Sequence, residues 1–181
     1  MHYYGERVRL RPPEEEDLPL FVEWLSNPEM RNYLTIRYIS QALEKEWFEQ
    51  LIPDTASGTP GRLHFVIETQ ENQQPIGVIS LEGINWRDRT AEVGITVGDT
   101  EFWGKGYGTD AMLTLLDVGF RWFNLHRIFL RVVADNTRAV RSYEKCGFSH
   151  EGRLRQAVFV DGEYRDMLIM GMLAEELTSR S

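Results

Sequence analysis

The stretch FWGKGYGTDA, from Phe102 to Ala111, places glycines at three alternate positions, 104, 106 and 108. It stands directly before a segment whose apolar residues recur at helical spacing: Met112, Leu115, Leu116, Gly119, Phe120 and Phe123. Glycines let main-chain N–H groups approach a ligand closely, and the N-terminus of a helix favours an anion. Three interpretations therefore compete: a nucleotide phosphate site, a dinucleotide pyrophosphate site, or a plain turn. The three glycines with Lys105 between them favour an anion over a plain turn.

Spacing excludes a nucleotide site of the P-loop type. That motif requires G-x-x-x-x-G-K-[ST], because its lysine meets the terminal phosphates and its hydroxyl binds magnesium. Here Gly104-Lys105 is followed by another glycine, and the preceding Gly98 is one residue too far away. The dinucleotide motif is harder to dismiss, since residues 106–111 satisfy G-x-G-x-x-[GA] and Asp135 ends the next predicted strand.

The elements on both sides of the loop disfavour a dinucleotide-binding fold, which needs several alternating strand-helix units. Before the loop, residues 63–69, 75–84 and 90–97 read as strands of an antiparallel meander. After it, a helix over about 106–123 and a strand over 128–133 complete one βαβ unit, with parallel strands and a right-handed crossover.

The two ends of the chain complete the predicted fold. Val8 and Leu10 alternate with arginines as in a half-buried strand, and helical segments follow at about 14–25, 28–33 and 40–51, before a loop over 53–62. Near the C-terminus, Asn136 starts a helix that Gly147 stops. Asp161-Gly162 then joins two strands, about 150–160 and 164–173, in a hairpin. The sequence predicts the α/β (α+β) class, with a mixed, mostly antiparallel twisted sheet of about six to seven strands flanked by helices.

Composition indicates one globular domain in a reducing compartment. The chain has 181 residues, 42% of them hydrophobic, and 20 basic against 28 acidic side chains leave a net charge of −8. That charge argues against a nucleic-acid surface and mildly favours a cationic partner.

A single cysteine, Cys146, excludes an internal disulfide, and we read it as a core residue. No apolar stretch has the length of a signal peptide core or a membrane span, so we expect a cytoplasmic protein. The four histidines show no metal-ligand spacing, so we expect no metal.

Three blocks make the chain resemble the GNAT superfamily of acetyl-CoA-dependent N-acetyltransferases, over nearly its whole length. The first is AEVGITV, residues 91–97, leading into FWGKGYGTDA; the second is NTRAVRSYEKCGF, residues 136–148; the third is VFVDGEYRDMLIMGML, near the C-terminus. The resemblance implies a single GNAT-like domain over 1–181. Its parts would be 1–62, with strand one and the acceptor-side helices, 63–135, with the central strands and the CoA loop and helix, and 136–181, with the second motif helix and the hairpin.

The resemblance also implies a site for acetyl-CoA, with CoA as product. Strand residues Ile95, Thr96 and Val97 would offer main-chain groups to the pantetheine arm, and the main chain of Trp103, Gly104, Lys105, Gly106, Tyr107, Gly108 and Thr109 would cradle the pyrophosphate. The superfamily often has Arg or Gln where this chain has Trp103. Asn136 would contact the cofactor, although its simpler role is that of an N-cap, and one side chain can do both.

Amide formation requires that an ammonium lose a proton, that an oxyanion be stabilised and that a thiolate be protonated. The resemblance makes Tyr143 the general acid beside the CoA sulfur; the alternative is a core aromatic residue. A strand amide near Val97 would stabilise the oxyanion. As base we nominate Glu92, directly or through water, with a solvated face as an equal alternative.

The acceptor stays open. The opening segment, the glycine loop and the terminal block look most like the branch that contains ribosomal-protein N-terminal and polyamine acetyltransferases. The acceptor-side segments contribute Tyr33, Arg37, Tyr38, Tyr164 and Asp166. A peptide N-terminus, a polyamine and an amino sugar or antibiotic all fit as acceptors. A homodimer is compatible with the sequence as well. The competing classes are a CoA-binding module without turnover and, more remotely, a dinucleotide-binding enzyme.

Overall fold

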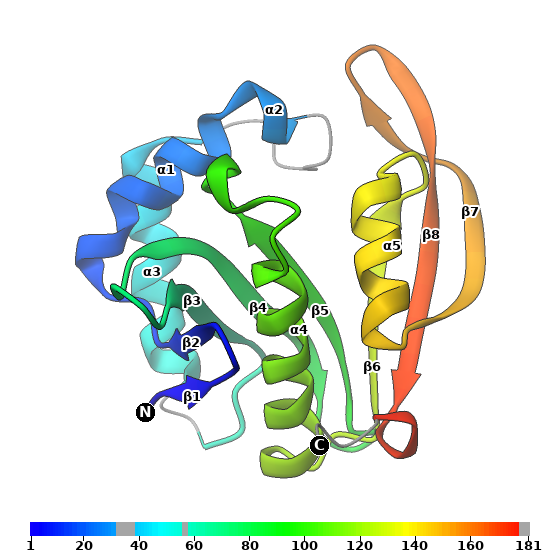
Figure 1. Cartoon of the computed structure of the whole chain (residues 1–181), viewed down its shortest axis with the longest axis horizontal. Helices are drawn as coiled ribbons and strands as arrows, with labels where there is room; N and C mark the ends of the chain where they lie inside the picture. Colours follow the sequence, from blue (N-terminus) through cyan, green and yellow to red (C-terminus); the bar gives the residue numbers. More distant parts are fainter. Residues whose placement is uncertain (32–38, 56–57, 178–181) are drawn as a thin grey trace.

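A computed structural model describes residues 1–31, 39–55 and 58–177 of the chain. Within these residues eight strands form one mixed sheet in the order β1-β2-β3-β4-β5-β6-β8-β7 (Figure 1). The strands are β1 (Tyr3–Tyr4), β2 (Val8–Arg11), β3 (Leu63–Thr69), β4 (Pro75–Asn85), β5 (Thr90–Val97), β6 (Arg127–Val133), β7 (Ser149–Val160) and β8 (Glu163–Leu173). All neighbouring strands are antiparallel except β5 and β6, which are parallel. The predicted fold class and the βαβ pairing are therefore confirmed.

Five α-helices accompany the sheet in the described part of the chain. They are α1 (Leu18–Ser26), α2 (Pro28–Arg31), α3 (Gln41–Thr55), α4 (Tyr107–Asp117) and α5 (Thr137–Cys146). Short 3-10 turns cover Glu15–Asp17, Thr100–Phe102 and Ala174–Glu176. None of these helices is long and apolar enough to cross a membrane.

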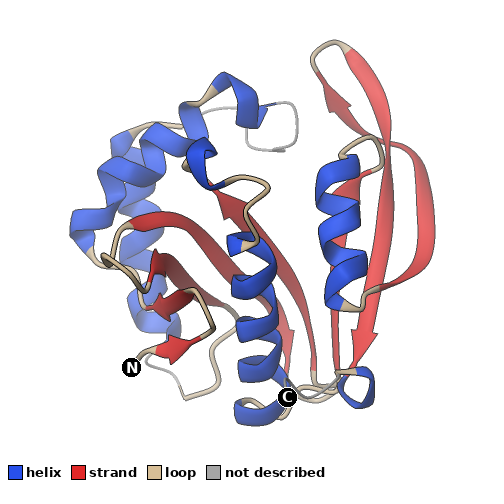
Figure 2. Ribbon diagram, viewed as in Figure 1, coloured by secondary structure: helices blue, strands red, loops and turns tan. Residues whose placement is uncertain are grey.

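Each face of the sheet packs against different helices. Phe65, Ile67, Ile79 and Leu81 of β3 and β4 join the core cluster that includes Met112, Leu115 and Leu116 of α4. Their alternate neighbours Val66 and Val78 turn to the other face, where they meet Leu18, Phe21 and Trp24 of α1 and Trp47 and Phe48 of α3. Because side chains alternate along a strand, the same strands contribute to a hydrophobic cluster on each face of the sheet. Figure 2 shows α4 and α5 beside each other, with α1 and α3 grouped elsewhere on the sheet.

Several local predictions hold at the level of single residues. Asn136 caps α5 by accepting from the amide of Ala139, and Gly147 ends the helix with a φ of 98°. Asp161 and Gly162 both have positive φ, 49° and 86°, as the tight hairpin turn between β7 and β8 requires. Cys146 is buried, as expected of a core residue.

Three boundaries differ from the predictions. The two-residue strand β1 pairs with β2 and raises the number of described strands to eight, because it is too short to show a period. The helix predicted over 106–123 ends at Asp117 and continues as one π-helical turn, Val118–Trp122. Helix α3 reaches Thr55, past Pro53, where we predicted a loop; the buried Leu51 anchors the turn before that proline.

Candidate functional site

Strands β5 and β6 separate partway along their length. They pair only between Thr90–Glu92 and Arg127–Phe129, although β5 continues to Val97 and β6 to Val133. Along 93–97, β4 pairs with one edge of β5, and no described strand pairs with the other edge. The parallel pair therefore opens into a fork whose inner edge presents main-chain groups.

A cleft of about 1100 Å³ occupies this fork. Its lining comes from both faces of the sheet, since it includes Tyr143 of α5 on the α4 side and Trp47 of α3 on the other side. The predicted site residues that line it are Glu92, Ile95, Thr96, Val97, Trp103, Gly104, Gly106, Gly108, Thr109, Asn136 and Tyr143. The sequence thus identified most of one wall of a continuous cleft.

Two predicted residues of the loop do not line the cleft. The main-chain carbonyl of Lys105 accepts a hydrogen bond from Arg7 Nη1 at 2.9 Å. The ring of Tyr107 packs edge-on against Phe102, with centroids 5.1 Å apart, and rests on the core. The main chain of Lys105 and the side chain of Tyr107 therefore hold the loop against the rest of the fold.

The glycine loop is shaped to admit an anion. Gly104 and Gly106 have φ values of 70° and 90°, and a Cβ at either would meet nothing within 4 Å, so both border open space. Gly108 permits close packing, since a Cβ there would lie 3.3 Å from Val97 Cγ2. Gly106 is the N-cap of α4 and offers no capping side chain, so the first amides of the helix are left for a ligand. This geometry fits a phosphate group.

Cationic side chains of α5 line the same cleft as the glycine loop. The Trp103 indole donates through Nε1 to the carbonyl of Val97 at 2.7 Å, and the Arg138 guanidinium lies 3.6 Å from the centroid of the Trp103 ring. Arg141 and Lys145 also line the cleft from α5. No carboxylate in the described ranges forms an ion pair with Arg138, Arg141 or Lys145. The α5 side of the cleft is therefore positively charged in an acidic protein.

Tyr143 presents a protonated hydroxyl to the cleft. Its ring packs edge-on against Phe148 at a centroid distance of 6.1 Å, and among the described residues its hydroxyl has no hydrogen-bond partner. Burial, and secondarily the neighbouring Cys146, raises the pKa of Tyr143 to about 12. The phenol is consequently neutral and able to donate at physiological pH. Tyr143 thus combines the core packing that was its alternative interpretation with access to the cleft.

Glu92 lies where the strands diverge. Its two carboxylate oxygens accept from Arg131 Nε and Nη2, at 2.8 and 2.9 Å, across the fork from β5 to β6. This pairing raises the pKa of Arg131. Glu92 lines the cleft, as expected. Its carboxylate is paired there with Arg131, which sequence reasoning did not identify.

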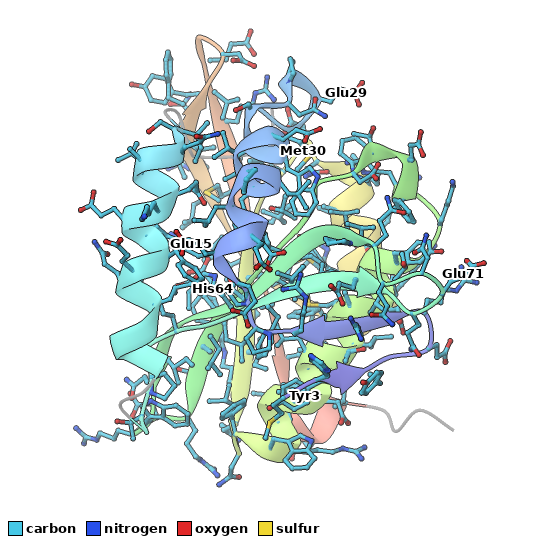
Figure 3. All side chains as sticks on the ribbon, turned by 90° about the vertical axis from the view of Figure 1, so that its left-hand side faces the viewer. Tyr3, Glu15, Glu29, Met30, His64 and Glu71 are labelled. Atoms are coloured by element: carbon cyan, nitrogen blue, oxygen red, sulfur yellow. The ribbon has the colours of Figure 1, made fainter. Side chains whose placement is uncertain are left out.

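A second group of cleft residues was also missed. Glu82 of β4 is the direct cross-strand partner of Glu92, and its Oε1 lies 2.8 Å from His64 Nε2, although the ring N–H is not aligned for a good hydrogen bond. His64 packs edge-on against Trp47 at 4.9 Å, and Figure 3 shows it in the region of α1 and α3. Glu44 of α3 completes the group. The one sequence signal for Glu82 was the alternation of side chains along β4, which puts Glu82 on the face of the sheet that the buried Leu81 does not occupy.

The two glutamates of this group differ in their environments. Burial would raise the pKa of Glu82, but His64, Ser80 and Arg62 outweigh it, so the pKa of Glu82 lies below its ordinary value. Burial raises the pKa of Glu44, and the charge of His64 opposes this only in part. The cleft therefore also carries carboxylates, from α3 and β4, that a bound cation would stabilise.

The acceptor residues named from the sequence lie elsewhere. Tyr164 is 67% exposed and packs on Phe159 near the tip of the hairpin. The Asp166 carboxylate accepts from Arg153 Nε and from the amide of Gln156, at 2.6 and 2.7 Å. Neither lines the cleft, to which the hairpin instead contributes Ala157, Val158 and Met167. Tyr33, Arg37 and Tyr38 lie outside the described residues.

No group of three His, Cys, Asp or Glu side chains in the described ranges is placed to hold a metal ion.

Comparisons with known proteins agree with this geometry. Residues 7–149 match the family described as acetyltransferase (GNAT) domain. The chain is 33% identical, over 177 residues, to the spermidine N(1)-acetyltransferase of Vibrio cholerae, an alignment that covers 98% of this chain and 99% of that protein. It is 29% identical over 174 residues to the uncharacterized N-acetyltransferase p20 of Bacillus licheniformis, covering 96% of each. The crystal structure of the Vibrio cholerae spermidine N-acetyltransferase in complex with CoA and spermine superposes with a TM-score of 0.86 and 32% identity, over 94% of this chain and 97% of that one.

Proposed function

Because the chain belongs to the GNAT family of acetyltransferases, we propose that it transfers the acetyl group of acetyl-CoA to a primary amine of a small polycation of the polyamine class. The observation that carries this proposal is the charge polarity of the cleft. Arg138, Arg141 and Lys145, which form no ion pair with a described carboxylate, line the cleft from α5, and the carboxylates of Glu44, Glu82 and Glu92 line it from α3, β4 and β5, where Arg131 pairs with Glu92. A phosphate-bearing donor and a cationic acceptor would each meet the opposite charge.

The residues present fit the donor. The main chain of Trp103 to Thr109 would hold the pyrophosphate, with the α4 amides and the glycine cradle nearest to it. The free edge of β5 at Ile95, Thr96 and Val97 would pair with amide groups of the pantetheine arm. Asn136 would add a side-chain amide, because its cap uses only the carbonyl oxygen.

The donor supplies an activated thioester, so no enzyme nucleophile is needed for direct transfer within a ternary complex. Tyr143 would donate its proton to the departing sulfur, a role for which its raised pKa keeps it protonated. A main-chain amide near Val97 would donate to the acyl oxygen. Glu92, directly or through water, would take a proton from the acceptor ammonium; the bidentate pair with Arg131 fixes its orientation.

Two observations favour a polyamine acceptor over the alternatives. The acceptor end carries carboxylates beside aromatic side chains, Trp24 and Trp47, which suits an alkyl chain bearing several ammonium groups. The spermidine acetyltransferase of Vibrio cholerae aligns with this chain over nearly the whole length of both. A peptide N-terminus and an amino sugar each offer fewer positive charges to these carboxylates.

An acceptor panel tests the proposal. The protein is incubated with acetyl-CoA and spermidine, spermine, a basic peptide or an amino sugar, while free thiol and product mass are followed. We expect the highest kcat/KM with the polyamines. Tight CoA binding without turnover on any amine would instead support a CoA-binding module, and preferential turnover of the amino sugar would support the antibiotic-type alternative.

Compartment and assembly remain parts of the proposal. Cys146 is buried and forms no disulfide within the described residues, which is compatible with a reducing cytoplasm. A homodimer is tested by the mass of the native protein in solution.

A further inference from the structure

An indole holds a guanidinium at the donor end of the cleft. Trp103 follows the 3-10 turn after β5, and its Nε1 donates to the carbonyl of Val97 at 2.7 Å, which fixes the plane of the ring. The Arg138 Cζ lies 3.6 Å from the centroid of that ring. Both side chains line the cleft together with Gly104 and Gly106. The hydrogen bond and the stack therefore connect the end of β5 to the first turn of α5.

We propose that Arg138, stacked on Trp103, binds a phosphate group of the donor. The inference rests on the proposed function, because the ligand is the phosphate-bearing part of acetyl-CoA. A stacked guanidinium keeps its N–H groups at the edge of its plane, where they remain free to donate to phosphate oxygens. No described carboxylate neutralises Arg138 or competes for those N–H groups.

The other cations near the loop lack this combination. The side chain of Lys105 does not line the cleft, although the residue stands between the glycines. Arg141 and Lys145 line the cleft, but no aromatic ring in the described residues is stacked against either. Holding a side chain in place before binding reduces the entropy that binding must overcome. Arg138 is therefore the preorganised cation of the donor site.

The stack also explains why a tryptophan can stand at position 103. Trp103 occupies the loop position at which the resemblance places Arg or Gln, and its own N–H is already used by Val97. In this chain the indole acts as a platform, and the positive charge comes from the neighbouring helix.

Calorimetric titration of CoA into the purified full-length protein tests the inference without requiring turnover. Arg138→Gln is expected to weaken CoA binding by roughly tenfold or more, since charge-assisted hydrogen bonds to phosphate are strong, and to flatten the salt dependence of the dissociation constant. Arg87→Gln is the matched control, because Arg87 is exposed in the turn between β4 and β5, outside the cleft lining. It should bind CoA as the wild type does.

Substitutions of the platform separate stacking from charge alone. Trp103→Leu removes the ring and should weaken CoA binding, and the double variant Trp103→Leu with Arg138→Gln should lose less than the sum of the two single losses. Arg138→Lys keeps the charge but not the planar fork, and should fall between the wild type and Arg138→Gln. Additive losses in the double variant would contradict the role of the stack.

Dephospho-CoA identifies which phosphate is bound. If Arg138 contacts the pyrophosphate, Arg138→Gln weakens CoA and dephospho-CoA by the same factor; if it contacts the 3′-phosphate, only CoA is affected. Both results support a phosphate-binding role. Equal CoA affinity of Arg138→Gln, Arg87→Gln and the wild type would overturn this inference alone, whereas a wild type that binds no CoA would overturn the proposed function as well.

Discussion

Glu82 and Glu92 stand directly opposite each other on β4 and β5, and each carboxylate lies beside a different basic side chain. Like charges at facing positions of an antiparallel pair are destabilising. Here His64 lies 2.8 Å from Glu82, while Arg131 makes a bidentate pair with Glu92. The two carboxylates can therefore remain side by side in the cleft, where an ammonium group would be stabilised by both.

The Tyr143 hydroxyl is expected to contribute mainly to the chemical step. Tyr143→Phe should lower kcat at neutral pH by about 10²-fold or more, the range for a lost general acid, with little change in KM for either substrate. Steady-state and single-turnover kinetics measure this. Glu92→Gln should have a much smaller effect, because water can still carry the proton. Equal activity of Tyr143→Phe and the wild type would remove the general-acid role.

The raised pKa of Tyr143 has a consequence for stability at high pH. A group whose folded pKa lies near 12, above the ordinary 10, binds its proton more tightly in the folded state, so its contribution is complete below pH 10 and is lost as pH rises to 12. The loss amounts to about 3 kcal/mol. The free energy of unfolding, measured with urea, should therefore decrease less between pH 9 and pH 11 for Tyr143→Phe than for the wild type. Parallel decreases would place the alkaline sensitivity elsewhere.

Glu82 is expected to affect the acceptor and not the donor. Glu82→Gln removes the charge beside His64 and should raise KM for a polyamine by roughly tenfold, as for a charged hydrogen-bond partner, and leave CoA affinity unchanged. Initial rates at saturating acetyl-CoA give this KM. Glu163→Gln, at the exposed start of β8, is the control for overall charge. A change in CoA affinity comparable to that in KM would contradict separate donor and acceptor ends.

A buried ion network near the N-terminus should govern stability and not chemistry. Glu68, only 4% exposed, accepts from Arg9 and Arg11, and Arg11 in turn pairs with the buried Asp17 at 2.7 Å. Glu68→Gln leaves the arginines short of a partner and should lower the free energy of unfolding by about 3 kcal/mol. Chemical denaturation measures the loss. Glu71→Gln, in the exposed turn after β3, should be neutral, and kcat of the folded Glu68 variant should be retained.

Features that depend on neighbouring residues could be predicted from the sequence. The left-handed cap at Gly147, the cap at Asn136 and the Asp161-Gly162 turn each follow from local backbone chemistry, and the structure has all three. The glycine loop before an amphipathic helix belongs to the same class, because an anion site at a helix N-terminus is made by consecutive amides.

The contacts that decide the chemistry of the cleft join residues far apart in the sequence. His64 meets Glu82 through the register of β3 and β4, Arg131 reaches Glu92 because β5 and β6 are parallel until they diverge, and Arg138 lies on Trp103 where α5 passes the end of β5. No local pattern encodes strand register or the point of divergence, since a shift of one residue would turn these side chains to the other face. The sequence alone thus specified the glycine loop and the helix caps, and only the tertiary structure decided which charges share the cleft with that loop.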